Sequence, residues 1–411
     1  MLDELFELSR HLVRQAQRPY RRYLMKGATF GGRCTILTGQ RGVGKTTCLV
    51  QHLAETFPDY AVSRKCLYLP SDHFLVARTP LYEIARDFAN QGGRLLCLDE
   101  VHKYLPWPRD IKSLLDTFSD LRVVASGSSM LQIHSSTHDL SRRAVVHHLH
   151  GMSFREFLEL RLDLRLPVVA LADLLRKHEH LAPELATQVA GKQQSVLDLF
   201  REYLEWGFYP YFREYPNRDL FWAVLEQSMH TAIESDLVAI HPSLTGNSVA
   251  RIKRLLTAIA GSVPFTPDLV KLRRLLEISD DRTLKAYLQY LVDAGLIMAL
   301  HREGGGLKAM EKPGRIYLGD PNQAFAVGGA QRTELGAVRE TFFCRLVSVR
   351  HQVQAATDTD FLVDGRWHFE VGGRTKTARQ IAAVPDAYLA VADTPVGVGR
   401  RIPLWLFGFL Y

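Results

Sequence analysis

The sequence predicts a protein of the α/β class with a parallel sheet near its N-terminus, and three observations support this class. The first is a glycine-rich turn at residues 39–47, placed between an apolar strand and an amphipathic helix. The second is a pair of further apolar strand candidates, 94–100 and 121–126, of which the first ends in two adjacent acids, as at the carboxyl edge of a parallel sheet. The third is helical periodicity through most of residues 153–245.

The composition predicts a cytoplasmic, globular protein of about two to four domains. Of the 411 residues, 46% are hydrophobic and 23% are charged. No apolar run reaches the roughly 18 residues of a membrane span, so no membrane association is expected. The amphipathic N-terminal segment begins acidic and turns basic, unlike a signal peptide. The five cysteines form no CxxC pair, which fits a reducing compartment. A net charge of +7 is compatible with nucleic acid but does not predict it.

The turn GQRGVGKTT predicts a phosphate-binding loop (P-loop) for ATP or ADP. It matches G-x-x-x-x-G-K-[ST], with the strand candidate CTILT before it and the helix candidate TCLVQHLAETF after it. In such a loop, backbone N–H groups at a helix N-terminus face the phosphates. Lys45 would reach the β and γ phosphates, and the Thr46 hydroxyl would ligate Mg²⁺. The candidate nucleotide-binding residues are Gly39, Gln40, Arg41, Gly42, Val43, Gly44, Lys45, Thr46 and Thr47.

The acids that follow RLLCL predict the hydrolytic groups. Asp99 would hold Mg²⁺ through its water shell, and Glu100 would orient and deprotonate the attacking water. After the strand LRVVAS, Ser126 and Ser128 are both candidates to sense the γ-phosphate, and the sequence does not choose between them. An arginine in SRRAVV would either reach a nucleotide held by a neighbouring copy in a homo-oligomer or lie on the surface.

Two clusters in the first half of the chain invite a functional interpretation but favour a structural one. The histidines of VVHHLH lie in a predicted strand, where neighbours point to opposite faces, so we do not expect them to share a metal. The segment GFYPYF (207–212) is either a stacking platform for bases or a loop that packs its aromatic rings into a helical core. We favour the packed loop.

Residues 248–320 show the pattern of a winged-helix domain, with three helices followed by two strands around a glycine-rich connection. The third helix is predicted to begin at the N-cap Ser279. Its leucines 284, 288 and 291 would face the core, and the outward, DNA-contacting positions would be Arg282, Lys285 and Gln289. Residues 248–318 hold twelve Lys and Arg against seven Asp and Glu, which favours double-stranded DNA. Winged helices also dock proteins, so that alternative stays open.

These motifs together resemble the bacterial and archaeal AAA-type ATPases in which an N-terminal P-loop domain is followed by a C-terminal domain of uncharacterised function related to restriction-type nucleases. The matching segments are GQRGVGKTT, LLCLDEVHKYLPWPRDIKSLLDTF, VVASGSS, DLSRRAVVHHLHGMSFREFLE, the helix and strand around 279–300, and DTDFLVDGRWHFEV. The resemblance implies a P-loop ATPase domain at 1–152, a helical lid at 153–247, the winged helix at 248–320 and an α/β nuclease-like domain at 321–411. It also selects Arg143 over Arg142 as the arginine that acts in a neighbouring copy.

The resemblance further implies a nuclease-like cluster of Glu340 on a helix, Asp360 at a strand end and Glu370 on the next strand. A restriction-type core has a lysine two residues after the last acid, where this chain has Gly372. Lys376 or Arg374 would have to move in from the following loop, and four extended residues span about 13 Å. We therefore expect an inactive core. The final segment IPLWLFGFLY is predicted as a buried strand.

The sequence thus predicts a cytoplasmic, Mg²⁺-dependent ATPase that couples its nucleotide state to the binding of DNA or of a partner. Two alternatives belong to other classes. One is an ATP-regulated DNA nuclease, and the other is a nucleotide-switched module that docks proteins and does not bind nucleic acid.

Overall fold

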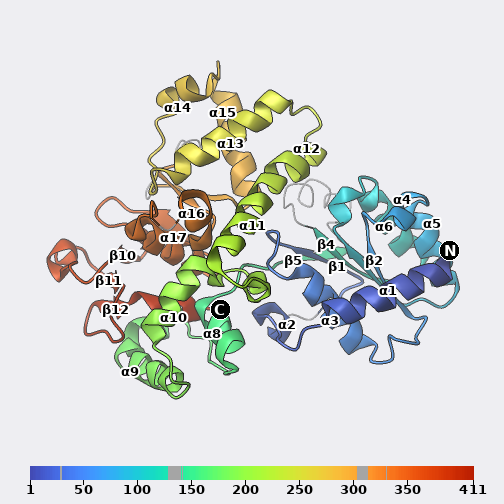
Figure 1. The fold of residues 1–411 in the computed structure, drawn as a ribbon, viewed down its shortest axis with the longest axis horizontal. Helices are drawn as coiled ribbons and strands as arrows, with labels where there is room; N and C mark the ends of the chain where they lie inside the picture. The colour runs from blue at the N-terminus through green and yellow to red at the C-terminus, as the bar shows by residue number, and fades with distance from the viewer. Residues whose placement is uncertain (28–29, 128–139, 141, 303–312, 330) are drawn as a thin grey trace. The chain divides into compact units, whose positions relative to one another are not determined.

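The computed structural model describes residues 1–411 except 28–29, 128–139, 141, 303–312 and 330. The chain divides into two compact units. Figure 1 shows the chain coloured by residue number from the N-terminus to the C-terminus. The first unit comprises Met1–Gly151 and Ser235–Pro242, and the second comprises Met152–Glu234 and Ser243–Tyr411. The segment 235–242 therefore packs with the first unit, although the chain on both sides of it belongs to the second.

A five-stranded sheet forms the centre of the first unit, with the strand order β2-β3-β4-β1-β5. Every pair of neighbouring strands in it is parallel, which confirms the predicted α/β class for this part of the chain. β1 and β3 are buried along their whole length, as in parallel sheets covered on both faces. The strands are β1 (Cys34–Thr38), β2 (Cys66–Pro70), β3 (Leu95–Asp99), β4 (Arg122–Gly127) and β5 (Ala144–His148).

Helices cover this sheet on both faces (Figure 1). α3 packs against β3 and β4, while α5 and α6 pack against each other and contribute Phe88 and Trp107 to a core shared with the strands. The helices of the first unit are α1 (Leu2–Ala16), α2 (Tyr23–Gly27), α3 (Lys45–Thr56), α4 (Phe74–Ala77), α5 (Leu81–Asn90), α6 (Trp107–Thr117) and α12 (Leu237–Ile240). This arrangement brings the carboxyl ends of β1, β3 and β4 together at one edge, where the candidate site lies.

The second unit begins with a helical region. Its helices are α8 (Phe154–Leu162), α9 (Leu171–Ala190), α10 (Val196–Glu202) and α11 (Arg218–Thr231). In the aromatic segment that follows α10, Phe208, Tyr209 and Phe212 are at most 3% exposed. The interpretation of GFYPYF as a loop packed into the helical core is therefore confirmed.

Three helices and a hairpin follow, namely α13 (Gly246–Ala260), α14 (Leu269–Leu276), α15 (Asp281–Asp293), β6 (Ile297–Leu300) and β7 (Arg315–Leu318). The leucines predicted to face the core on α15 are buried. The prediction of Ser279 as N-cap is wrong by one residue, because the carboxylate of Asp280 accepts the N–H of Thr283 at 2.8 Å. A charged acceptor at this end of a helix is also favoured by the helix dipole.

The last part of the second unit is a mixed sheet with the strand order β12-β11-β10-β9-β8. β8, β9 and β10 are antiparallel, whereas β10, β11 and β12 are parallel. Helix α17 packs against β10. The elements are α16 (Pro321–Gly328), α17 (Leu335–Val347), β8 (Val353–Ala355), β9 (Phe361–Val363), β10 (Trp367–Gly372), β11 (Ala387–Val391) and β12 (Arg401–Pro403).

The prediction of a strand over IPLWLFGFLY is wrong for most of its length. The strand β12 ends at Pro403, and Leu404–Phe409 forms a buried 3₁₀ helix. Proline has no N–H to continue the ladder, and an unbroken apolar run cannot distinguish a strand from a helix. The rings of Trp405 and Phe409 contact Phe154 of α8, with centroids 6.4 and 6.2 Å apart.

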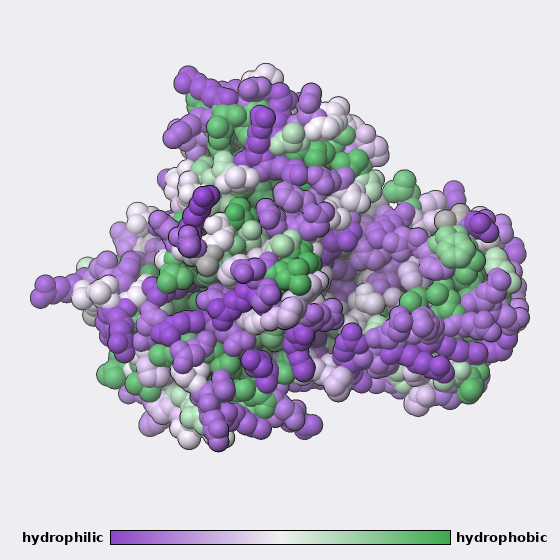
Figure 2. Space-filling view, in the orientation of Figure 1, coloured by the Kyte–Doolittle hydropathy of each residue, from purple (hydrophilic) through white to green (hydrophobic). Residues whose placement is uncertain are grey.

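Within the described residues, no helix has the length and apolar character to cross a bilayer. On the face shown in Figure 2, hydrophilic surface predominates and the hydrophobic patches are small and separated.

Candidate functional site

The P-loop runs from the end of β1 into the first turn of α3, as predicted. Gly44 precedes α3 with a φ of 99°, a left-handed conformation that favours glycine. A Cβ atom at Gly39 would collide with the carbonyl oxygen of Leu149, so this position also requires glycine. The first N–H groups of an α-helix have no partner within the helix, so the start of α3, directly after the loop, is suited to binding phosphate.

Lys45 is buried inside the loop that it belongs to. Its ammonium group donates to the carbonyl oxygens of Gly39 at 2.9 Å and Gln40 at 3.0 Å. Burial lowers the pKa of Lys45, and the charges of Glu100 and Asp99 oppose this effect. A buried ammonium gains from stronger, charge-assisted partners, so phosphate oxygens would replace these neutral carbonyls favourably.

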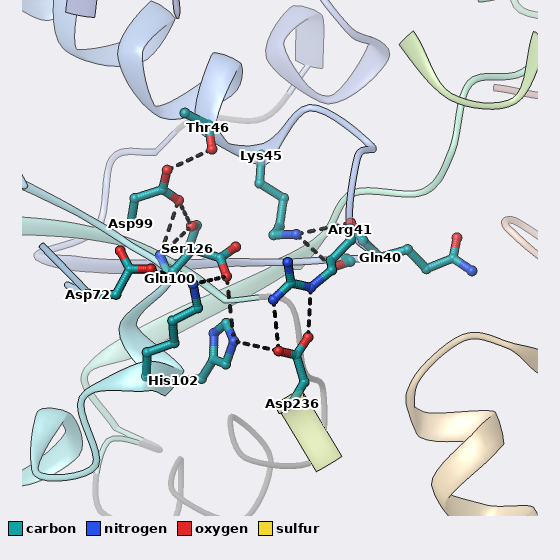
Figure 3. Close-up of polar contacts among 12 residues, drawn as sticks. Gln40, Arg41, Lys45, Thr46, Asp72, Asp99, Glu100, His102, Ser126 and Asp236 are labelled. Atoms are coloured by element: carbon teal, nitrogen blue, oxygen red, sulfur yellow. Dashed lines mark hydrogen bonds and ion pairs between the residues drawn. The ribbon is translucent and has the colours of Figure 1, made fainter. Parts of the chain in front are cut away.

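Asp99, at the end of β3, accepts hydrogen bonds from side chains of three neighbouring elements, and Figure 3 shows those from Thr46 and Ser126. The Thr46 hydroxyl donates to its Oδ2 at 2.6 Å and the Tyr68 hydroxyl at 2.8 Å, while Ser126 donates to Oδ1. Burial raises the pKa of Tyr68, and the nearby charge of Asp99 raises it further, so Tyr68 stays a neutral donor. The Thr46 hydroxyl and the Asp99 carboxylate are oxygen ligands of the kind that Mg²⁺ prefers, so the residues present fit this ion.

Glu100 follows with an unusual backbone conformation. Its φ of 53° is left-handed, which is uncommon for a residue other than glycine and is often found at functional sites. Its N–H donates to the hydroxyl of Ser126 at 3.2 Å. Its carboxylate lies 3.6 Å from Nε2 of His102 and 3.8 Å from Nζ of Lys103. The structure thus brings together Lys45, Thr46, Asp99, Glu100 and Ser126, whereas Ser128 lies outside the described residues.

Sequence reasoning missed four residues of this site. Arg22 donates to the carbonyl of Val43 and, at 2.7 Å, to that of His150, so it braces the P-loop. Tyr68 stands in β2 beside β3, and its place in an adjacent apolar strand could have suggested it. The remaining two are His102 and Asp236. Asp236 binds Arg41 of the P-loop although 195 residues separate them, and no sequence pattern links the two.

Arg143, the candidate that would act in a neighbouring copy, lies on the surface of the first unit. It pairs with Asp116 of α6 at 2.8 Å, and both side chains are substantially exposed. The proposed role in a second copy stays a prediction. In the second unit, Arg282 and Gln289 of α15 are exposed and Lys285 is partly exposed, so these three reach solvent as predicted.

The nuclease-like residues lie close to one another in the second unit. Lys376 donates to the carboxylate of Glu370. A Cβ atom at Gly372 would collide with the side chain of Lys376, so the lysine occupies the space that a residue at 372 would fill. Asp360 accepts the N–H of Val371 at 2.8 Å. Lys376 therefore lies beside Glu370 and Gly372, although it comes four residues after the position at which the sequence pattern expects a lysine.

The other groups around this cluster are also paired. Tyr317 donates to Glu340 at 3.0 Å, and Arg315 lies 3.3 Å from Asp360. Burial, together with the charge of Asp360, raises the pKa of Glu340, and burial with the charge of Glu370 raises that of Asp360. Among the residues that the structure describes, no group of three His, Cys, Asp or Glu side chains is arranged to hold a metal ion.

Comparison with known proteins identifies the first unit. Residues 32–158 match the model of the AAA domain. Residues 32–158 therefore form an AAA domain, which makes up most of the first unit. Residues 197–331 match a domain of unknown function, DUF8612, which spans the second half of the predicted lid, the predicted winged helix and the first residues beyond it.

Individual relatives are distant. An uncharacterized protein of Methanocaldococcus jannaschii is 31% identical over 140 residues, which cover 32% of this chain and only 28% of that relative. The Walker-type ATPase PABY2304 of Pyrococcus abyssi is similar at 13% identity and a TM-score of 0.39, covering 78% of this chain and 95% of its own. PCH-2 of C. elegans is similar at 14% identity and a TM-score of 0.26, covering 71% and 68%. At such scores the two structures add nothing to the assignment, which depends on the AAA match and the geometry of the site.

Proposed function

We propose that this protein is a Mg²⁺-dependent ATPase that couples its nucleotide state to the binding of double-stranded DNA. The observation that carries the ATPase part is the assembled site, in which the P-loop lysine and the Thr46–Asp99 pair lie at the carboxyl edge of one parallel sheet. Ligands of open parallel sheets bind at this edge.

Each side chain at the site has a defined task in this proposal. Lys45 would bind the β and γ phosphates, and Thr46 and Asp99 would hold Mg²⁺, which neutralises charge on the phosphates when it is bound. Glu100 would orient the attacking water and accept its proton. Ser126, which contacts both Asp99 and the N–H of Glu100, would sense the γ-phosphate. Arg143 would act on a nucleotide of a neighbouring copy only in a homo-oligomer.

The DNA part of the proposal depends on residues 246–318. Three helices precede the β6–β7 hairpin, and Phe265 pairs with Ile316 beside it. This order of elements supports the proposal of a winged helix. The basic excess of this segment and the exposed side chains of α15 support contact with a groove of DNA. The division into the predicted ATPase, lid, winged-helix and nuclease-like domains belongs to this proposal as well.

The test measures nucleotide binding and ATP turnover with and without double-stranded DNA, in Mg²⁺. Lys45→Ala should abolish binding, because the phosphates lose their buried cation. Glu100→Gln should still bind ATP but turn over about 100-fold or more slowly, since the water loses its base. Lys177→Ala, which removes an exposed lysine of α9, serves as the control and should behave like the wild type. Equal turnover in Glu100→Gln would exclude its assigned role, and a rate unaffected by DNA would favour a protein-docking module.

A second candidate function, an ATP-regulated nuclease, is favoured by the position of Lys376 beside Glu370. In nucleases of this kind a lysine next to the acidic residues stabilises the transition state or helps to activate water. Plasmid DNA from the same assays should be inspected for cuts with Mg²⁺ and with Mn²⁺. Cuts that disappear in Lys376→Ala and Glu370→Gln, but persist in Lys177→Ala, would establish this function. Intact plasmid under all conditions would leave an ATPase with an inactive nuclease-like core, as the sequence predicts.

A further inference from the structure

One carboxylate, that of Asp236, contacts two parts of the candidate ATP site. It ends a π-helical turn, Ala232–Asp236, and is 7% exposed. Its two oxygens accept hydrogen bonds from Nε and a terminal nitrogen of Arg41, each at 2.9 Å (Figure 3). Burial alone would raise the pKa of Asp236, but hydrogen bonds from His102 and Arg41 outweigh this and lower it, so Asp236 is an anion at neutral pH.

Arg41 is a residue of the P-loop, so the group that Asp236 holds stands next to the phosphate position. Lys45 donates to the carbonyl oxygen of Gln40, the residue before Arg41, and Figure 3 shows the Arg41 guanidinium between Lys45 and Asp236. Guanidinium groups bind phosphate and carboxylate with the same two-pronged geometry. A phosphate and Asp236 would therefore compete for the same nitrogen atoms.

The second contact of Asp236 leads to the hydrolytic carboxylate. His102 is fully buried, and its Nε2 lies 3.9 Å from Oδ1 of Asp236 and 3.6 Å from the carboxylate of Glu100. One imidazole thus stands between the two acids. A displacement of Asp236 would change the partners of His102 and, through it, the position of Glu100.

The segment that carries Asp236 has an unusual place in the chain. Residues 235–242 pack with the first unit, while the residues before and after them belong to the second. The contacts of Asp236 with Arg41 and His102 lie within the first unit, yet the backbone on both sides of the segment leads into the second. A change at the phosphate position would reach the second unit along the chain itself.

We propose that Asp236 competes with the phosphates of the nucleotide for Arg41, so that nucleotide binding releases the segment 235–242 from the first unit. This inference depends on the proposed function, because it needs a nucleotide in the P-loop. Asp236 is then a positioning residue that acts through Arg41 and His102. Coupling between two sites is reciprocal. If the bound nucleotide weakens the pairing of Asp236 with Arg41, that pairing must weaken nucleotide binding by the same factor, so removing the carboxylate should strengthen nucleotide binding.

The first experiment titrates the full chain with a fluorescent ATP analogue in Mg²⁺. Asp236→Asn should bind it about 5- to 50-fold more tightly than the wild type, a typical range for coupled sites. In a protein that already carries Arg41→Ala, the further change Asp236→Asn should have almost no effect, since the competition no longer exists. Glu234→Gln is the matched control, because it removes an equal charge two residues away, from an exposed pair with Lys253. It should bind like the wild type.

The second experiment follows hydrogen exchange of the wild type by mass spectrometry, which does not depend on how a variant folds. Backbone amides in 235–242 should exchange faster when the ATP analogue and Mg²⁺ are present. Unchanged or slower exchange there, or an Asp236→Asn protein that binds no more tightly than the wild type, would overturn the inference while leaving the ATPase intact. Failure of the wild type to bind the analogue at all would overturn both proposals.

Discussion

At the scale of single residues, the second unit contains a buried acid, Asp320, that none of the sequence motifs predicted. Asp320 is fully buried at the start of α16, where its carboxylate accepts the N–H groups of Asn322 at 3.0 Å and Gln323 at 3.2 Å. The hydroxyl of Tyr209 donates to it at 2.6 Å. Burial raises the pKa of Asp320 to about 6, although these hydrogen bonds act in the opposite direction. The acid joins the aromatic loop 207–212 to α16.

The stability of the second unit should consequently depend on pH through Asp320. An acid whose pKa is higher in the folded than in the unfolded protein stabilises the fold most at pH values below its unfolded pKa. This stabilisation is lost as the pH rises through its folded pKa. We expect a loss on the order of 1–3 kcal/mol between about pH 4 and pH 6. Asp320→Asn should flatten this part of the profile, because the amide keeps an acceptor oxygen but does not titrate.

The measurement is urea unfolding at several pH values, followed by tryptophan fluorescence. Four of the five tryptophans, 206, 222, 367 and 405, lie in the second unit, so the signal reports mainly on it. A slope between pH 4 and pH 6 that is equal in the wild type and in Asp320→Asn would contradict the assignment.

At the scale of elements, the segment SFREF organises a helix together with a distant part of the chain. Ser153 and Glu156 form a capping box at the start of α8, each side chain bonding the other's backbone N–H at 3.2 Å. The Ser153 hydroxyl and Nε of Arg155 also donate to the carbonyl of Tyr411, at 3.0 and 2.9 Å. Arg155 pairs in turn with Glu159, and both are almost fully buried. One short motif thus fixes the helix start and anchors residues 404–411.

Ser153→Ala should therefore destabilise the second unit by about 1–2 kcal/mol, since it removes the helix cap and one donor to a buried carbonyl. Ser195→Ala is the matched control. Ser195 caps α10 through a longer bond of 3.4 Å to the N–H of Asp198 and is exposed, so its loss should cost clearly less. The free energies of unfolding of both variants check this ranking, and equal costs would show that the contact with Tyr411 contributes little.

At the scale of the whole molecule, the chain passes between its two units three times. It leaves the first unit after Gly151, returns with residues 235–242 and then stays in the second unit. The groups proposed for ATP chemistry come from residues 39–126, whereas the carboxylate proposed to respond to the nucleotide comes from the returning segment. A chain path of this kind gives the nucleotide site a covalent connection to the second unit in both directions.

The sequence alone determined those features whose signal is local. The P-loop, the strand end at Asp99, the strand that carries Ser126 and the buried leucines of α15 could all be predicted. A turn between strand and helix, an acid after an apolar run and a helical period are all visible in residues that are neighbours in the sequence. Where the local signal is ambiguous the prediction failed. Two capping residues stood side by side at 279 and 280, and IPLWLFGFLY has no period that separates a strand from a 3₁₀ helix.

Only the tertiary structure decided the contacts between residues that are far apart in the chain or displaced within a motif. Arg41 pairs with Asp236, and no motif in the residues around either side chain indicates that the two meet. Lys376 lies beside Gly372 and pairs with Glu370, a contact that the spacing of the sequence pattern did not predict. In both cases the physical reason is that the attraction between two charges depends on their distance in space. For residues far apart in the sequence, that distance is known only once the whole chain has folded.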